Sequence, residues 1–212
     1  MEAIHARIAE LGVVPVIALD DAAQALPLAD ALTEGGLPVA EITFRTQAGQ
    51  AAIRAIAKHR SDCLVGAGTI LTIDQLHAAR DAGAAFGVSP GLNPKVVAEA
   101  IRMGFAFSPG VMTPSDVEAG LDAGLTVLKF FPAEAIGGIK ILKALAGPYR
   151  HTGVKFIPTG GINTRNFTEY LASDVVLAVG GSWVARRDDI AAGDWEKVRS
   201  NCRAIRAALK KD

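Results

Sequence analysis

The strongest constraint on the fold of this chain is a set of short apolar segments that recur at a nearly regular interval. The segments begin about 20 to 30 residues apart, a spacing that fits one strand, one helix and two short loops per step. They are VVPVIAL (13–19), PVAEITF (38–44), CLVGAGT (63–69), AAFGVS (84–89), FAFSPGV (105–111), TVLKFFP (126–132), VKFIPTGG (154–161) and VVLAVGGS (175–182). Strands that are apolar along their length and alternate with helices form a parallel sheet covered by helices. The count of eight favours a closed (β/α)8 TIM barrel, of the α/β class, over an open doubly wound sheet.

The stretches between the apolar segments carry helix start and stop signals. Residues 20–36 open on aspartate and close on Gly-Gly, and Pro27 within them predicts either a kink or a late helix start. Thr72 is a suitable N-cap, and Pro114 occupies the first helical position of a later helix. An extra N-terminal helix, over about residues 1–11, is expected to cap the bottom of the barrel. Since no linker or shift in composition interrupts the pattern, residues 1–212 are expected to form a single barrel domain.

The composition is that of a compact α/β protein and excludes several other classes. Hydrophobic residues make up 50% of the chain and aromatic residues only 6%. Lys+Arg and Asp+Glu both number 22, so no net field attracts nucleic acid or an anionic membrane. No apolar run approaches the roughly 18 residues of a membrane helix, and the charged N-terminal segment does not resemble a signal peptide. We therefore expect a soluble, cytoplasmic protein without a nucleic-acid or membrane partner.

Lys129 stands inside an apolar segment, where a lysine loses solvation unless it is paired or gives up its charge. The other lysines fall at the ends of helices or strands, or in tails. One interpretation is structural: a half-exposed lysine at a strand end, or a buried lysine neutralised by a carboxylate. The other is catalytic, because apolar surroundings favour the neutral amine, which attacks ketones and forms a Schiff base.

Glu41 interrupts another strand core in the same way. Alternation along a strand puts Glu41 and Arg45 on one face of their strand, and Lys129 on the same face as Phe131. If these faces point into the barrel, Lys129, Glu41 and Thr69 share its interior. Arg45 then lies near the mouth, at the end of the barrel where active sites form. A catalytic pair explains Glu41 and Lys129 better than two independent anomalies do.

The last two apolar segments end on glycine-rich turns. In barrels of this kind the loops after strands seven and eight often bind phosphate through backbone amides and a helix N-terminus. The glycines alone would be explained by tight turns, but two such turns with hydroxyl donors beside them favour phosphate. The candidate phosphate-binding residues are Thr159, Gly160, Gly161, Gly181 and Ser182. The histidines show no ligand spacing, so no metal site is expected.

Taken together, the motifs resemble those of a known family along nearly the whole chain. The matching segments are VPVI (14–17), EITFRT (41–46), GAGT (66–69), VSPG (88–91), SPGVMTP (108–114), KFFPAE (129–134), PTGGI (158–162) and GGSW (180–183). In this order and spacing they resemble the class I aldolases that cleave 2-keto-3-deoxy-6-phosphogluconate (KDPG) and 4-hydroxy-2-oxoglutarate (KHG). The resemblance implies a Schiff-base role for Lys129 and a general acid/base role for Glu41. It further implies a substrate pocket lined by Arg45, Thr69, Pro90 and Phe131, and a phosphate held by Gly160, Gly161 and Ser182.

The resemblance also implies a reaction, and members of the family are typically homotrimers. Unprotonated Lys129 attacks the C2 ketone, the carbinolamine loses water to give an iminium ion, and the C3–C4 bond breaks. Glu41, directly or through water, takes the proton of the C4 hydroxyl group. Arg45 and Thr69 hold the C1 carboxylate. Neither a metal nor an organic cofactor is needed for these steps.

Three other interpretations stay open. The preferred 2-keto acid could be 4-hydroxy-2-oxoglutarate or 2-dehydro-3-deoxy-6-phosphogalactonate, although the arginine of EITFRT favours the phosphogluconate branch. A phosphate-binding isomerase barrel without covalent chemistry fits the glycine-rich turns but leaves Lys129 unexplained. A sugar-phosphate-binding module without turnover is the third.

Overall fold

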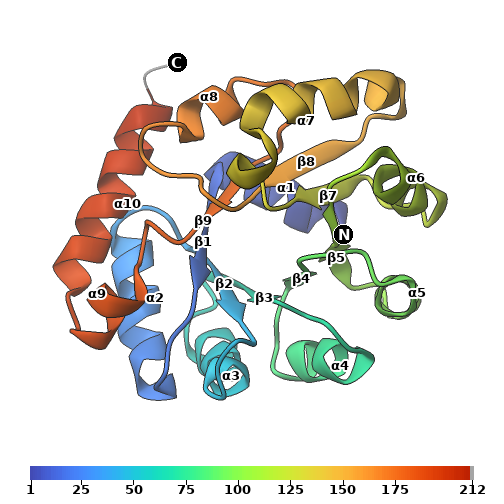
Figure 1. The fold of residues 1–212 in the computed structure, drawn as a ribbon. Coiled ribbons are helices and arrows are strands. Elements are labelled where there is room, and N and C mark those ends of the chain that lie inside the picture. The colour runs from blue at the N-terminus through green and yellow to red at the C-terminus, as the bar shows by residue number, and fades with distance from the viewer. Residues whose placement is uncertain (211–212) are drawn as a thin grey trace.

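The computed structural model describes residues 1–210, and its strands form a ring with helices outside it (Figure 1). One sheet has the strand order β5-β4-β3-β2-β1-β9 and a second has the order β6-β7-β8, with parallel pairing in both. The strands are β1 (Val13–Ile17), β2 (Val39–Thr43), β3 (Leu64–Gly68), β4 (Phe86–Val88), β5 (Ala106–Ser108), β6 (Gly110–Val111), β7 (Val127–Phe130), β8 (Lys155–Pro158) and β9 (Val179–Gly181). Isolated parallel bridges from Phe156 to Val176 and from Thr159 to Gly180 join β8 to the β9 segment. The predicted α/β barrel is confirmed.

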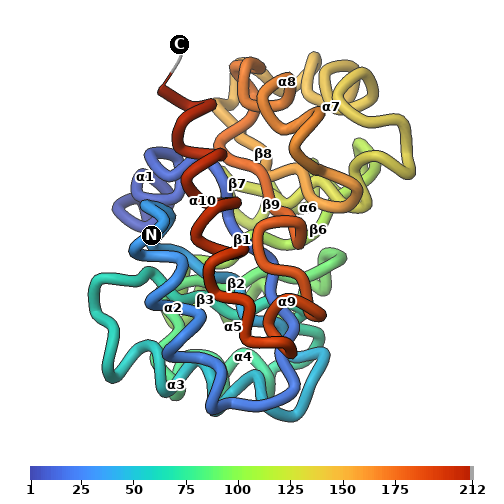
Figure 2. Tube along the Cα trace, turned by 90° about the vertical axis from the view of Figure 1, so that its left-hand side faces the viewer, coloured from blue at the N-terminus to red at the C-terminus, as the bar shows by residue number. Residues whose placement is uncertain are grey.

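The helices alternate with the strands as the sequence pattern predicts. They are α1 (Glu2–Leu11), α2 (Ala25–Glu34), α3 (Gly49–His59), α4 (Ile73–Asp81), α5 (Pro94–Arg102), α6 (Pro114–Asp122), α7 (Gly138–Ala146), α8 (Phe167–Leu171), α9 (Arg187–Ala191) and α10 (Trp195–Leu209). Short 3-10 helices are η1 (Ala22–Gln24), η2 (Glu134–Ile136) and η3 (Gly147–Thr152). Seen from the side, α10 packs against α2 on the outside of the barrel (Figure 2). None of the helices within residues 1–210 is long and apolar enough to cross a membrane.

The predicted helix starts are confirmed where a cap determines them. Thr72 accepts a hydrogen bond from the Gln75 amide at the start of α4, and Thr113 forms a capping box with Asp116 at the start of α6. Pro27 does not kink a long helix. Residues 22–24 form the separate helix η1, and α2 then begins at Ala25, so that Pro27 lies in its first turn. The extra N-terminal helix α1 directly precedes β1 and buries Ile8 and Leu11.

Several strands are shorter than their apolar segments. The predicted fifth strand is divided at Pro109 into β5 and β6, since a proline lacks the backbone N–H that a ladder needs. Strand β7 ends at Phe130, so Phe131 follows the strand instead of belonging to it, and β9 begins only at Val179. Burial, more than strand pairing, explains the apolar character of the remaining residues, because Val175 and Ala178 are buried outside any strand.

Candidate active site

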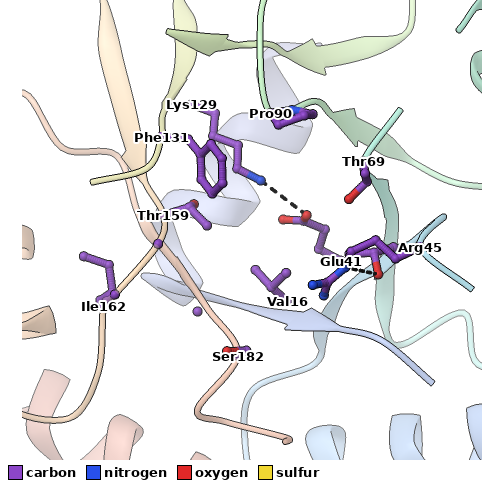
Figure 3. A pocket seen from close by; sticks show the side chains of 14 residues that line it. Val16, Glu41, Arg45, Thr69, Pro90, Lys129, Phe131, Thr159, Ile162 and Ser182 are labelled. Carbon is purple, nitrogen blue, oxygen red and sulfur yellow. Dashed lines mark hydrogen bonds and ion pairs between the residues drawn. The ribbon is translucent and has the colours of Figure 1, made fainter. Parts of the chain in front are cut away.

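The carboxyl ends of the strands open into a cavity of about 300 Å³ (Figure 3). Its lining comes from β1, β2, β7 and β9 and from the loops that follow β2, β3, β4, β7, β8 and β9. The lining residues are Val16, Glu41, Thr43, Arg45, Thr69, Pro90, Lys129, Phe131, Thr159, Gly160, Gly161, Ile162, Gly181 and Ser182. A cavity at this end of a barrel is where substrates of such folds bind.

The side chains of Lys129 and Glu41 point toward each other within this cavity (Figure 3). The Nζ atom of Lys129 lies 3.5 Å from Oε1 of Glu41, and the two residues are only 6% and 3% exposed. The same Nζ atom lies 5.5 Å from the centroid of the Phe131 ring. A lysine in this position has one carboxylate and an aromatic face as close neighbours. The surroundings disfavour an unpaired charge on either group and leave both side chains within reach of a molecule in the cavity.

Glycine on the neighbouring strand makes room for Glu41. Strand β3 pairs with β2 so that Glu41 lies opposite Gly66 and Thr43 opposite Gly68. A Cβ atom at Gly68 would lie 2.1 Å from Oε1 of Glu41 and 2.8 Å from its Cδ and Cγ atoms. The carboxylate therefore folds over Gly68, and any larger residue there would displace it. On the other side of β2, Val16 pairs with Glu41 and supplies an apolar wall to the cavity.

Arg45 is held at the cavity by Thr43. The Thr43 hydroxyl group donates to the Ile17 carbonyl at 2.8 Å and accepts from Nε of Arg45 at 3.1 Å. Because Thr43 is buried and tied to β1, it fixes the direction of the arginine side chain. The guanidinium group points into the cavity (Figure 3). Such a planar cation suits the two oxygens of a carboxylate.

Thr69 has φ of 60°, the one positive φ of a non-glycine residue within residues 1–210. The left-handed conformation costs a threonine about 1–3 kcal/mol. Glycine would relieve this strain but would lack a hydroxyl group. The threonine is explained if its hydroxyl group is used in the cavity that it lines.

The turns after β8 and β9 form the opposite side of the cavity from β3 and β4. Gly160 and Gly161 have φ values of 100° and 83°, a region that glycine adopts without strain. Within the described part of the chain, no backbone or side-chain group accepts a hydrogen bond from the amide of Gly161. Ser182 is exposed at the same side. An unpaired backbone amide with a nearby hydroxyl group makes a suitable site for a phosphate.

All of the residues that the sequence predicted for the site line this cavity, although their roles remain predictions. Phe131 does so from beyond the end of β7. Val16, Thr43 and Ile162 also line the cavity and were not predicted from the sequence. Strand alternation could have identified Thr43, which shares a face with Glu41, whereas Val16 and Ile162 carry no polar signal.

Comparisons with known proteins agree with this geometry. The family model described as KDPG and KHG aldolase matches residues 4–201. The 2-dehydro-3-deoxy-phosphogluconate aldolase of Haemophilus influenzae is 45% identical over 204 residues, covering 96% of this chain and 95% of the relative. A structure of KDPG aldolase from Legionella pneumophila, with pyruvate captured as a covalent carbinolamine, has a TM-score of 0.90 and 39% identity over 96% of each chain. A structure of the Zymomonas mobilis aldolase with 3-phosphoglycerate has a TM-score of 0.85 and 41% identity, covering 96% of this chain and 93% of that one.

Proposed function

Because the chain belongs to the family of KDPG and KHG aldolases, we propose that it is a class I aldolase acting through a lysine Schiff base. It cleaves 2-dehydro-3-deoxy-6-phosphogluconate to pyruvate and D-glyceraldehyde 3-phosphate. The observation that carries the proposal is buried Lys129, whose Nζ atom lies 3.5 Å from Glu41 in the cavity at the carboxyl ends of the strands. An isomerase without covalent chemistry would have no use for this amine.

The reaction begins when neutral Lys129 attacks the C2 ketone and forms a carbinolamine. Glu41 donates the proton with which the carbinolamine loses water, and the resulting iminium ion withdraws electrons from the C3–C4 bond. Glu41, directly or through water, then takes the C4 hydroxyl proton as that bond breaks. Glyceraldehyde 3-phosphate leaves, the enamine is protonated at C3, and water releases pyruvate from the lysine.

The two ends of the substrate are held by different sides of the cavity. Arg45, held by Thr43, and the hydroxyl group of Thr69 bind the C1 carboxylate, while Pro90 and Phe131 confine the carbon chain. The amides of Gly160 and Gly161, with Ser182 and its neighbour Gly181, bind the phosphate. Thr159 lies below Phe131 in Figure 3 and is only 6% exposed, which suits a contact to the middle of the substrate as well as to its phosphate.

Borohydride trapping and a cleavage assay test the function directly. Pyruvate with borohydride should load the protein covalently, with the adduct on Lys129 by mass spectrometry, and the phosphorylated substrate should yield pyruvate in a coupled assay. A protein that neither traps pyruvate nor cleaves the substrate would rule the proposal out. Parallel kinetics with 4-hydroxy-2-oxoglutarate and the phosphogalactonate isomer rank the alternative substrates.

Ser182→Ala tests the phosphate end. A hydrogen bond to a charged group is typically worth about 1.5–3 kcal/mol, so kcat/KM for the phosphorylated substrate should fall roughly tenfold to a hundredfold. The double variant with Thr159→Ala should lose at least as much. Trapping of pyruvate, which carries no phosphate, serves as the control and should change little. Equal losses in both assays would assign these turns a different role.

We also propose that the enzyme assembles as a homotrimer in the cytoplasm. The family resemblance supports the trimer, and exposed Leu71 and Ile73 at the start of α4 are apolar side chains that a subunit contact would bury. Two free buried cysteines suit a reducing compartment. Light scattering after size exclusion should give three times the mass of the 22.0 kDa chain, and a monomer would contradict the assembly.

A further inference from the structure

The turn that follows β8 is held from outside by the segment that follows β7. The amide of Ala133 donates to the carbonyl of Thr159 at 2.8 Å, and the amide of Glu134 donates to the carbonyl of Gly160 at 3.0 Å. Both donors lie a few residues beyond Lys129. The position of the turn relative to the lysine therefore depends on how this segment is itself held.

The side chain of Glu134 accepts a hydrogen bond from the hydroxyl group of Tyr170 on α8. Tyr170 is only 1% exposed, so its hydroxyl group depends on a protein partner. Burial, and secondly the carboxylate of Glu134, raise the pKa of Tyr170, so the phenol keeps its proton and stays a donor at physiological pH. Glu134 thus links η2 to α8 through a charge-assisted hydrogen bond.

The stem of Glu134 also packs directly against the glycine turn. A Cβ atom at Gly161 would lie 2.5 Å from Cβ and 2.7 Å from Cγ of Glu134. A Cβ atom at Gly138 would lie 2.9 Å from Oε1 of Glu134 and 3.2 Å from the Tyr170 hydroxyl oxygen. Glu134 therefore fills the space between two glycines, and Tyr170 determines where its carboxylate lies.

The orientation of the turn explains why this support matters. The Gly161 carbonyl accepts hydrogen bonds from the side-chain amides of Asn163 at 2.9 Å and Asn166 at 3.4 Å. The Gly160 carbonyl accepts a hydrogen bond from the backbone amide of Glu134. With both carbonyls engaged by the protein, the amide of Gly161, which has no acceptor within residues 1–210, is left for a ligand in the cavity that Gly160 and Gly161 line. Glycines have no side chain to hold this arrangement, so their neighbours must hold it.

We propose that Glu134 and Tyr170 form a positioning pair that holds the Gly160–Gly161 turn in its anion-binding geometry, at a set distance from Lys129. The inference rests on the proposed function and extends it. Neither residue lines the cavity. Their effect is selective for the phosphorylated substrate, because the pair acts on the turn and not on the Lys129 amine.

Three variants and a matched control test the pair by steady-state kinetics. Tyr170→Phe removes the donor and keeps the ring, Glu134→Ala removes the acceptor, and Glu134→Gln keeps an acceptor oxygen. Both removals should raise KM for the phosphorylated substrate about tenfold, with a smaller effect on kcat, while Glu134→Gln should stay within about threefold of wild type. Exchange of pyruvate methyl protons, followed by NMR, should be unchanged in all three.

Tyr149→Phe is the matched control. The Tyr149 hydroxyl group donates to Oε1 of Glu118 at 2.9 Å, a bond of the same chemistry on η3, which precedes β8 and lies at the opposite end of that strand. This variant should keep wild-type KM and kcat. Melting temperatures measured for all variants separate a loss of stability from a change in KM.

Unchanged KM in both Tyr170→Phe and Glu134→Ala would overturn the pair. So would an equal loss in pyruvate exchange, since that would indicate a general structural role. If Tyr170→Phe does not fold, Glu134→Ala decides alone, because Glu134 is exposed and is not part of the hydrophobic core. A wild type that traps no pyruvate would instead refute the proposed function, and the premise of the pair with it.

Discussion

At the scale of single residues, the site depends on two ionisable side chains that the fold removes from water together. Lys129 and Glu41 are separated by 88 positions in the chain but lie 3.5 Å apart, Nζ to Oε1. Burying one without the other would leave an uncompensated charge away from water, which is costly. A shared position lets one side chain take up the proton that the other gives away, as Schiff-base chemistry requires.

Lys129→Met should abolish cleavage while the protein still folds. Methionine keeps most of the apolar volume of lysine and removes the amine, so turnover should fall about 10³-fold or more. A coupled assay of pyruvate formation and a thermal melt measure the two effects. Near-normal turnover in this variant would eliminate the Schiff-base mechanism.

Glu41→Gln separates a catalytic role from a purely structural one. If Glu41 shuttles protons, both cleavage and the exchange of pyruvate methyl protons should slow by about 10² to 10⁴-fold, the usual contribution of such a group. NMR exchange measured on wild type and variant, with folding checked by circular dichroism, gives the answer. Unimpaired exchange would leave Glu41 as a counter-ion only.

At the scale of elements, strand β3 shows how glycines on a neighbouring strand can shape a site. Its glycines lie opposite bulky groups: Phe86 of β4 covers Gly66, and the Glu41 side chain covers Gly68. Glycine weakens a strand by its flexibility, so its use at Gly68 trades some stability for space beside the carboxylate. The position of Glu41 is therefore set by β3 as much as by β2.

Gly68→Ala should impair the enzyme more than it destabilises the fold. The new methyl group would sit 2.1 Å from Oε1 of Glu41, so the carboxylate must turn away from the lysine. We expect kcat to fall about 10²-fold, the loss that a roughly 1 Å displacement of a catalytic group causes. Gly147→Ala is the control, since a Cβ atom there meets nothing within 4 Å and the backbone is right-handed helical. Wild-type kcat in Gly68→Ala would show that Glu41 need not occupy this position.

At the scale of the whole molecule, ring closure is what brings β2 and β7 to face each other. Both cysteine thiols of the chain are also buried. Cys63 immediately precedes β3 and is 4% exposed. Cys202 on α10 packs tightly against the end of α2: a Cβ atom added at Gly35 would lie 2.4 Å from the Cβ atom of Cys202. Burial raises the pKa of the Cys63 thiol to about 11 and that of Cys202 to about 12.

Both thiols should therefore react only when the molecule unfolds. At pH 8 the reactive thiolate is scarce and shielded, so an aromatic disulfide reagent should release almost no chromophore from native protein and two equivalents per chain in denaturant. Cys63→Ala should halve the denatured value. Rapid reaction of either thiol in the native state at pH 8 would show that the packing around it opens locally.

The sequence by itself was enough to predict the barrel, the approximate position of each strand and most of the polar residues that line the cavity. The period of the apolar segments reports the repeating strand and helix, and a charged residue inside such a segment is conspicuous because burial is costly. The cap at Thr72 and the helix start at Pro114 could also be predicted, since both depend on residues within one turn of the chain.

Only the tertiary structure decided where the strands end and which side chains meet. Alternation assigns a residue to a face, but the register across β2 and β3 decides that Glu41 lies over Gly68. The same is true of Val16, Ile162 and the bond from Tyr170 to Glu134, which join distant segments through packing. Distances between such segments depend on the tilt and stagger of the closed ring, a property of all the strands together that no local pattern encodes.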